Sequence, residues 1–330
     1  MNATAGREPR SDLRDFLRSR RARIGPEEMG VAAHPGRRRV PGLRREEVAQ
    51  LAGVSVDYYT RLEQGRTLHV SDEVLDAVAR ALRLDATERS HLFDLARPQR
   101  ATGPGRAAGA AAGAPGPAEA AGPQRVRAGL YRVLDALDDG TPAMIMGRRL
   151  EVLAANRLAE ALYADFGAAE PHTSEPDTPE PHASEPDTPE SGAPGHRGRN
   201  LARFLFLDPA ARGLFADWES AARAAVAALR FYAGRHPYDP DLSPLVEELG
   251  ALDGDFRRWW AGHDVLEHTH GTKRFRHPLV GELALEYESL AFPDDPDQTL
   301  YLYTAEPGSP SDEALRTLAS RAADAVRAQR

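Results

Sequence analysis

The stretch that decides the fold is LRREEVAQLAGVSVDYYTRLEQG, residues 43–65, whose spacing predicts two short helices joined by a tight turn. Apolar positions recur on one side of each helix: Val48, Ala49 and Ala52 in the first, Tyr59 and Leu62 in the second. Gly53 and Val54 form the turn, and Ser55 follows as a side chain able to cap the second helix. A plain helical hairpin in a larger bundle would share the apolar spacing, but it would not require a glycine at the turn with a cap directly after it. We therefore predict a helix-turn-helix.

Six positions of this stretch fit one register: Ala49, Gly53, Val54, Leu62, Glu63 and Gly65. The register resembles the XRE, or lambda-repressor-like, family of DNA-binding domains. The resemblance implies that the second helix, opened by Ser55, lies in the major groove of double-stranded DNA. It directs three side chains toward the base edges: Val56, Asp57 and Arg61. Arg61 suits guanine, Asp57 suits cytosine and Val56 suits a thymine methyl. The resemblance places three more side chains at phosphates: Arg44, Arg45 and Tyr58.

The segment before the helix-turn-helix is longer than the short turn of an ordinary XRE domain. It follows a predicted helix over residues 13–23, runs from Ile24 to Gly42, and contains Arg37, Arg38 and Arg39. Its end, RRRVPGLRREE, resembles the subgroup of MmyB-like regulators. Two interpretations of the three arginines remain open: they grip a phosphate strand or enter a minor groove, or they belong to a solvated loop.

Two further helices complete a predicted all-α domain of five helices over residues 1–97. One begins at Ser71 with Asp72 and Glu73 in its first turn, and Thr87 caps the other. Residues 98–123 are almost wholly Ala, Gly and Pro, which predicts a flexible linker. Residues 1–100 carry 19 Arg and 15 Asp plus Glu, a balance of +4, although the whole chain has a net charge of −8. This local positive charge favours a DNA partner.

Residues 124–330 predict a second domain of the α+β class. Short apolar runs at 143–146 and 150–154 indicate a hairpin, and Asn156 caps a helix that extends to Phe166. This opening is typical of PAS-like sensor domains. The later elements are one helical pattern over 209–236, a short helix holding Phe256, Trp259 and Trp260, strands over 273–277, 282–292 and 300–305, and a helix from Pro310. A repeated decapeptide, EPHTSEPDTP and then EPHASEPDTP, predicts a disordered insertion over 168–198.

Four pieces of the second domain, NLARFLFLD, RRWWAGHDV, GTKRFRHPLVGEL and YTAEPGS, resemble the ligand-binding domain of MmyB-like regulators. The resemblance implies a PAS-like domain with a buried pocket for an elongated apolar ligand such as a fatty acid. The pocket candidates are large apolar residues: Phe204, Phe206, Trp218, Tyr232, Trp260, Phe275, Leu285 and Tyr287. Arg230 or His263 would meet a polar end of the ligand. Each aromatic residue also fits an ordinary core position.

Two alternatives concern the function of the second domain. His263, Asp264, His268 and His270 raise the possibility of a metal-sensing or hydrolytic site, although Glu267 would alternate away from the histidines and the chain has no cysteine. The other alternative is a protein-interaction or dimerisation module without a small-molecule ligand. The sequence has neither a Gly-rich phosphate loop nor a GxSxG motif, so we expect no enzyme, and no cofactor other than a possible bound fatty acid.

The overall prediction is a ligand-responsive transcription regulator that binds operator DNA as a homodimer. The polar N-terminus and the lack of a long apolar run favour a cytoplasmic protein without a membrane partner. The only lysine, Lys273, indicates no particular function. For the ligand to change DNA binding, it must favour one arrangement of the DNA-binding domains over another.

Overall fold

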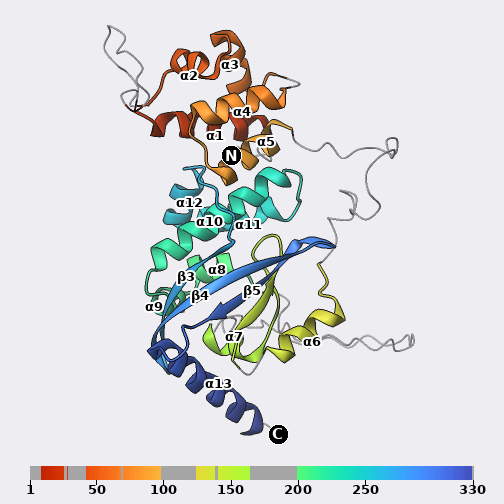
Figure 1. Cartoon of the computed structure of the whole chain (residues 1–330), viewed down its shortest axis with the longest axis vertical. Helices are drawn as coiled ribbons and strands as arrows, with labels where there is room; N and C mark the ends of the chain where they lie inside the picture. The colour runs from red at the N-terminus through yellow and green to blue at the C-terminus, as the bar shows by residue number, and fades with distance from the viewer. Residues whose placement is uncertain are drawn as a thin grey trace, which may run out of the picture. The chain divides into compact units, whose positions relative to one another are not determined.

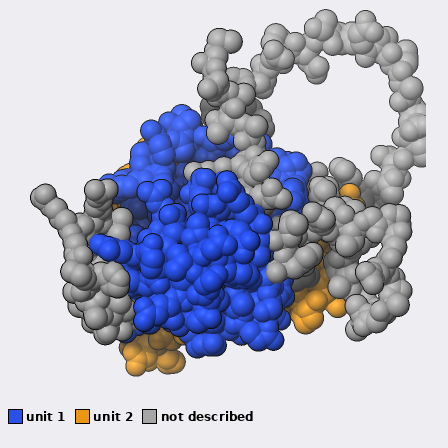
Figure 2. Space-filling model, turned by 90° about the horizontal axis from the view of Figure 1, so that it is seen from above, with its two compact units in different colours: residues 1–123, 222–268 blue, residues 124–221, 269–330 orange. Residues whose placement is uncertain are grey.

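The computed structural model describes residues 9–25, 28, 42–67, 70–97, 124–137, 140–163 and 199–328. The predicted linker, the predicted insertion over 168–198 and the run Arg37, Arg38 and Arg39 lie outside these described residues. The chain divides into two compact units, and neither is continuous in sequence (Figure 2). The first unit comprises residues 1–123 and 222–268, and the second comprises residues 124–221 and 269–330. Residues 222–268, which lie within the predicted second domain, thus belong to the same compact unit as the N-terminal helices.

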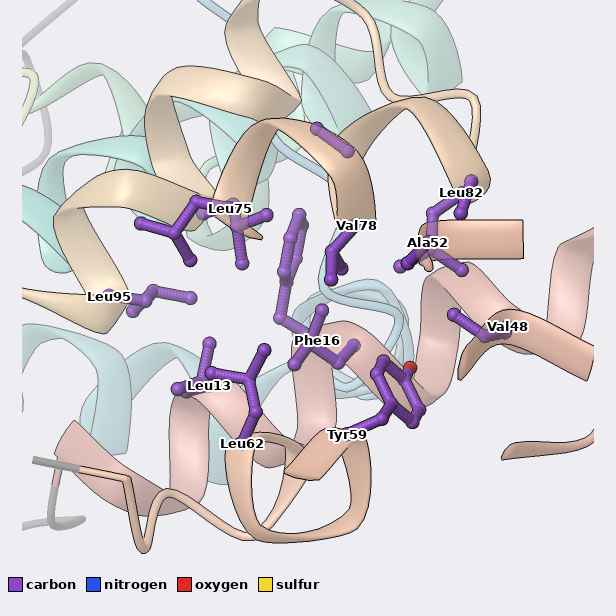
Figure 3. Packing of buried hydrophobic residues seen from close by; sticks show 14 of the residues in the cluster. Leu13, Phe16, Val48, Ala52, Tyr59, Leu62, Leu75, Val78, Leu82 and Leu95 are labelled. Atoms are coloured by element: carbon purple, nitrogen blue, oxygen red, sulfur yellow. The ribbon is translucent and has the colours of Figure 1, made fainter. Parts of the chain in front are cut away.

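Five helices form the N-terminal part of the first unit, as predicted (Figure 1): α1 (Pro9–Arg23), α2 (Arg45–Ala52), α3 (Val56–Glu63), α4 (Asp72–Ala81) and α5 (Ala86–Ala96). Their apolar faces meet in one core, in which Phe16, Tyr59 and Leu75 are fully buried (Figure 3). Isolated helices as short as α2 and α3 are marginal in water. Burial of each large apolar side chain stabilises the fold by roughly 1.5–3 kcal/mol. The shared core therefore holds the two helices in place.

The turn between α2 and α3 has the predicted chemistry. Gly53 ends α2 with a φ of 68°, a left-handed conformation that favours glycine. Ser55 then caps α3, and its side chain accepts a hydrogen bond from the backbone N–H of Tyr58 at 3.1 Å. A second glycine, Gly42, permits a close approach to α1, because an added Cβ would lie 2.3 Å from the carbonyl oxygen of Arg21. These two glycines fix the entry to the helix-turn-helix and its bend.

The predicted cap of α4 is confirmed, whereas the predicted cap of α5 is wrong. Ser71 caps α4 and accepts a hydrogen bond from the N–H of Val74. The cap of α5 is Asp85, so the prediction of Thr87 is wrong. The carboxylate of Asp85 accepts from the N–H of Glu88 at 2.8 Å, and the side chain of Glu88 accepts from the N–H of Asp85 at 3.2 Å. This reciprocal capping box starts the helix two residues earlier.

Three helices contribute to the rest of the first unit: α10 (Trp218–Arg235), α11 (Leu242–Leu252) and α12 (Gly254–Trp260). The prediction of one helix over 209–236 is wrong, since α9 (Pro209–Leu214) precedes α10 as a separate helix. The break is caused by a tertiary contact. Phe215 is extended and forms an isolated bridge with Phe275, and the N–H of Ala216 donates to the carbonyl of Arg274 at 2.9 Å. The boundary between the two units falls within α10, after Ala221.

The second unit is built on a five-stranded antiparallel sheet in the order β2-β1-β5-β4-β3. Its strands are β1 (Ala143–Met146), β2 (Val152–Ala155), β3 (His270–His277), β4 (Gly281–Phe292) and β5 (Asp295–Thr304) (Figure 1). Its helices are α6 (Ala128–Ala136), α7 (Arg157–Leu162), α8 (Leu201–Leu207), α9 and α13 (Pro310–Ala328). Asn156 caps α7 as predicted, but α7 ends before residue 166, the end that the sequence predicted. Helix α13 packs against α7 and β4, and α9 packs against β3.

In β4 one face is buried and the other is exposed, as its alternation predicts, whereas every residue of β1 is buried. Leu283, Leu285 and Tyr287 are buried, whereas Glu282 and Glu286 are exposed. The sequence also contains no candidate transmembrane segment in the part that the structure describes, where every helix is too short or too polar to cross a bilayer.

Candidate functional site

The buried and exposed positions of α3 follow the register that the sequence predicts. Tyr59 and Leu62 face the core, which leaves Val56, Asp57 and Arg61 exposed. Val56 is a large apolar residue with an exposed fraction of 42%, which suits contact with a partner. Arg61 forms an ion pair with Asp57 at 3.2 Å, one helical turn away. An exposed pair of this kind contributes little to stability, so its guanidinium can exchange the carboxylate for a base edge at small cost.

Arg45, which the resemblance places at a phosphate, pairs with a buried carboxylate in the structure. Arg45 bonds through two nitrogen atoms to the carboxylate of Glu63, at 3.0 and 3.2 Å, and Arg21 approaches the same carboxylate at 3.3 Å. Glu63 is completely buried, so two arginines neutralise one buried charge at the end of α3. The hydrogen bond to Glu63 raises the pKa of Arg45. Arg44 and Tyr58 are half-buried at the starts of α2 and α3.

A buried arginine joins α1 to the segment that follows α12. Arg20 is only 1% exposed, and its guanidinium pairs with Glu88 and with Asp264, both at 3.0 Å. It also donates to the backbone carbonyl of His263. Burial is the main cause that lowers the pKa of Arg20, and Glu88 opposes that effect. Each carboxylate therefore compensates part of the cost of burying the charge.

A second joint connects α5 with α10. The imidazole of His91 lies edge-on to Phe16, with ring centroids 5.0 Å apart, and is 6.2 Å from the ring of Phe231. Its Nδ1 is buried and has no hydrogen-bond partner among the described residues. Burial lowers the pKa of His91 to about 3, with further lowering by Arg230 and Arg20. The imidazole is therefore neutral at physiological pH. We use the name α5–α10 joint for the contacts that Arg20 of α1 and His91 of α5 make with residues 222–268.

This joint depends on a glycine. A Cβ added to Gly234 on α10 would lie 2.3 and 2.4 Å from two atoms of the His91 ring. Heavy atoms that are not bonded to each other do not come this close. Helix α10 therefore approaches α5 as it does only because residue 234 has no side chain. Further out, Arg235 pairs with Asp94 at 3.5 Å and lies over the ring of Phe231 at 4.4 Å.

The predicted ligand residues fall into two groups. Arg230, Tyr232, Trp260 and His263 belong to the first unit. Arg230 is buried, lies 3.7 Å from the centroid of Trp260, donates to the carbonyl of that residue, and faces Asp12 at 3.6 Å. Tyr232 donates to Asp239 at 2.6 Å. Arg230 is thus already bound within the protein, and its assignment to a polar end of the ligand stays an untested prediction.

The other group lies on the buried side of the sheet and the helices against it. It comprises Phe204, Phe206, Trp218, Phe275, Leu285 and Tyr287, all in the second unit. Phe206 meets Trp218 edge-on at 6.0 Å, and the indole N–H of Trp218 donates to the carbonyl of Leu205 at 2.8 Å. Phe275 packs against Phe215 at 5.4 Å. These rings pack against one another as core residues do. They also form an apolar face that suits an apolar ligand.

Three residues of this face did not appear among the predicted ligand residues. The hydroxyls of Tyr163 and Tyr303 share a buried hydrogen bond of 2.7 Å. Lys273 lies in register with Leu285, with its Nζ 5.2 Å from the ring centroid of Tyr287. The sequence position of Lys273 could have indicated this placement. Lys273 lies two residues before Phe275, so the two side chains face the same side of β3.

A small cavity of about 210 Å³ opens in the first unit beside the α5–α10 joint. Its lining residues come from α10, α12 and the segment after α12: Arg223, Ala224, Val226, Ala227, Trp259, Asp264 and Leu266. The histidines proposed for a metal have other contacts, since His268 faces the carbonyl of Ala224 at 3.3 Å. Within the described ranges, no three His, Asp or Glu side chains gather closely enough to hold a metal ion.

Comparison with known families agrees with this arrangement. A helix-turn-helix domain model matches residues 12–92, which contain α2 to α4 and most of α1 and α5. The model described as the MmyB-like transcription regulator ligand binding domain matches residues 126–318, more than half of the chain. No curated protein gives a significant match. The chain belongs to the family of MmyB-like transcription regulators, with a helix-turn-helix DNA-binding domain at its N-terminus and a ligand-binding domain of α+β class after it.

Proposed function

We propose that this regulator binds a specific operator sequence as a homodimer, through an XRE-type domain, and that an apolar, fatty-acid-like molecule bound in its PAS-like domain changes that binding. One observation carries the proposal. Residues 222–268 belong to the matched ligand-binding region but form one compact unit with the DNA-binding helices. A ligand that shifts these residues acts directly on the helices that hold α3. Two copies of the domain would read two half-sites of the operator.

The α5–α10 joint supports a route for this effect. Helix α10 is continuous from Trp218, which packs on Phe206, to Arg235, which pairs with Asp94 of α5. A helix moves as a rigid element, so displacement of its first turn by a ligand would change the contact of its last turns with His91. A ligand switches DNA binding only if it binds one of these arrangements more tightly than the other.

DNA recognition is tested by selecting preferred duplexes from a random library and measuring affinity for the best sequence. Arg61→Ala should cost about 1–3 kcal/mol at one preferred base pair, because a bidentate contact to a base edge is lost. The control is Arg80→Ala, which removes the same charge from an exposed position on α4. An unchanged base preference in Arg61→Ala would show that α3 does not read that base pair.

Ligand response is tested by measuring operator affinity with and without dodecanoate. Gly234→Ala should keep the DNA affinity of the free protein but lose most of the response, because the added methyl forces α10 away from the His91 ring. Gly250→Ala is a matched control, since that glycine lies within α11 and a Cβ there meets nothing within 4 Å. If Gly234→Ala responds as the parent protein does, the joint does not transmit the signal. If the purified protein contains no apolar ligand but a stoichiometric protein partner co-purifies with it, the second domain is instead an interaction module.

A further inference from the structure

Lys273 is the only lysine of the chain and faces the buried side of the sheet. It stands opposite Leu285 in the β3–β4 ladder, in the same side-chain alternation as Phe275 on its own strand. The exposed positions of β3 on the other side are His270, Thr272, Arg274 and Arg276. The sequence thus places arginines on the wet face and its single lysine on the apolar one. Because charged residues are rarely placed among apolar ones without a partner, this position needs an explanation.

The surroundings of this lysine are aromatic rather than acidic. Its Nζ lies 5.2 Å from the ring centroid of Tyr287 and 5.9 Å from that of Tyr303, within the range of cation–π attraction. In the described part of the chain, no carboxylate or carbonyl accepts a hydrogen bond from it, and no ion pair includes it. Burial lowers its pKa to about 8, so most of the molecules still carry the charge at neutral pH. The side chain remains half-buried, which leaves a route for a ligand to reach it.

The neighbouring backbone and hydroxyls complete a receptor-like arrangement. Gly271 stands opposite Tyr287, and a Cβ there would lie 3.1 Å from the Cε1 atom of that tyrosine, so glycine lets the ring lie across β3. Tyr301 lies on the same face, with its ring centroid 6.3 Å from that of Tyr287. Burial raises the pKa of Tyr301, which keeps its hydroxyl as a neutral donor. An uncompensated ammonium beside phenol donors on an apolar wall matches a carboxylate on an apolar body.

We propose that the ammonium group of Lys273 binds the carboxylate of the apolar effector, with the tyrosines of β4 and β5 around it. The inference rests on the proposed function, and it names a different cation from Arg230 and His263. The ligand class is a monocarboxylic acid with an apolar body. A carboxylate that compensates the buried charge binds more tightly than an uncharged molecule of the same length.

The test uses the full-length, delipidated protein with dodecanoate and 1-dodecanol as probes, measured by calorimetry. The parent protein should bind the acid at least tenfold more tightly than the alcohol. Lys273→Met should remove that preference and keep alcohol binding, because methionine preserves an unbranched apolar side chain. Arg274→Met is the control, since it removes the same charge from the adjacent position on the exposed face. An equal loss in both variants, or a parent protein that binds acid and alcohol equally, would overturn the anchor while leaving the sensor intact.

A second measurement does not depend on how the variant folds. Because the chain has one lysine, protein grown with ¹³C-lysine gives a single side-chain signal, which titrates with the pKa of that amine. Saturating dodecanoate should raise this pKa by one unit or more, and 1-dodecanol should not, since only the acid stabilises the charged amine. A pKa that dodecanoate leaves unchanged, although the acid binds, refutes the contact. If neither probe binds, the apolar-sensor proposal fails, and the anchor fails with it.

Discussion

The α5–α10 joint should make the first unit sensitive to acid through one residue, His91. Its imidazole is 1% exposed, and its pKa is about 3 in the folded protein, whereas an unfolded histidine has a pKa of about 6.5. The unfolded state therefore binds more protons below pH 6.5. The stability of the neutral joint is fully present above that pH and is lost progressively as the pH falls toward 3. At pH 5 the expected loss relative to pH 7.5 is about 2 kcal/mol from this group alone.

His91→Phe tests this value because phenylalanine keeps an aromatic ring against Phe16 and Phe231 but does not titrate. Urea unfolding at pH 7.5 and pH 5, followed by tryptophan fluorescence and circular dichroism, gives the free energy of unfolding at each pH. The variant should lose about 2 kcal/mol less than the parent protein between the two values. Any overpacking against Gly234 would lower both values equally, so the pH slope isolates the titration.

The refuting result is a His91→Phe variant that loses as much stability at pH 5 as the parent protein does. That outcome would mean that His91 is protonated in the folded state or that the joint opens before the protein unfolds. Either explanation would also remove the physical basis for the signal route through α10, because the route requires a closely packed, uncharged contact between α5 and α10.

Two further predictions concern buried polar groups. Asn156→Ala should cost about 2–4 kcal/mol in the second unit, because its side chain caps α7 and also bonds to the backbone of residues 141 and 143; thermal unfolding measures the loss, and a change below about 0.5 kcal/mol would contradict it. Glu63→Gln should destabilise the first unit by about 3–5 kcal/mol, since it leaves Arg21 and Arg45 around a neutral buried amide; the double variant Glu63→Gln, Arg45→Gln should recover part of this loss in the same urea assay.

Local signals in the sequence were sufficient for most of the elements. The cap at Ser55, the turn at Gly53 and the alternation in β4 depend on residues within a few positions of one another, and all three are confirmed. One error was local, because Asp85 rather than Thr87 caps α5. Another error arose where a distant residue decided the local structure. The helical pattern through Phe215 is continuous, but the bridge of that residue to Phe275 interrupts the helix. The hydrophobic periodicity around Phe215 or around Phe275 does not indicate that these two residues pair.

The division into units could not be predicted for a related reason. The chain order suggested a break between DNA-binding and ligand-binding domains at a linker, yet residues 222–268 pack with the N-terminal helices. The partners that hold them there, such as Arg20 with Asp264 and Asp12 with Arg230, are separated by most of the chain. In one sequence without an alignment, nothing links an arginine near the N-terminus to an aspartate in a later domain. The sequence also does not predict the close approach of Gly234 to His91, because a glycine within a helix indicates only a low helix propensity.

The same contacts decide how the candidate ligand residues should be interpreted. Arg230 already faces Asp12 and the carbonyl of Trp260, so an effector that binds it would have to replace these contacts. Among the described residues Lys273 has no ion pair, and its Nζ lies near the rings of Tyr287 and Tyr303. If an acid binds there, the free energy of that new ion pair is available at the sheet. It can change DNA binding only to the extent that it differs between two positions of α10. Gly234→Ala and Lys273→Met therefore separate two steps: the first variant should bind the acid without response, and the second should lose the acid while the joint remains intact.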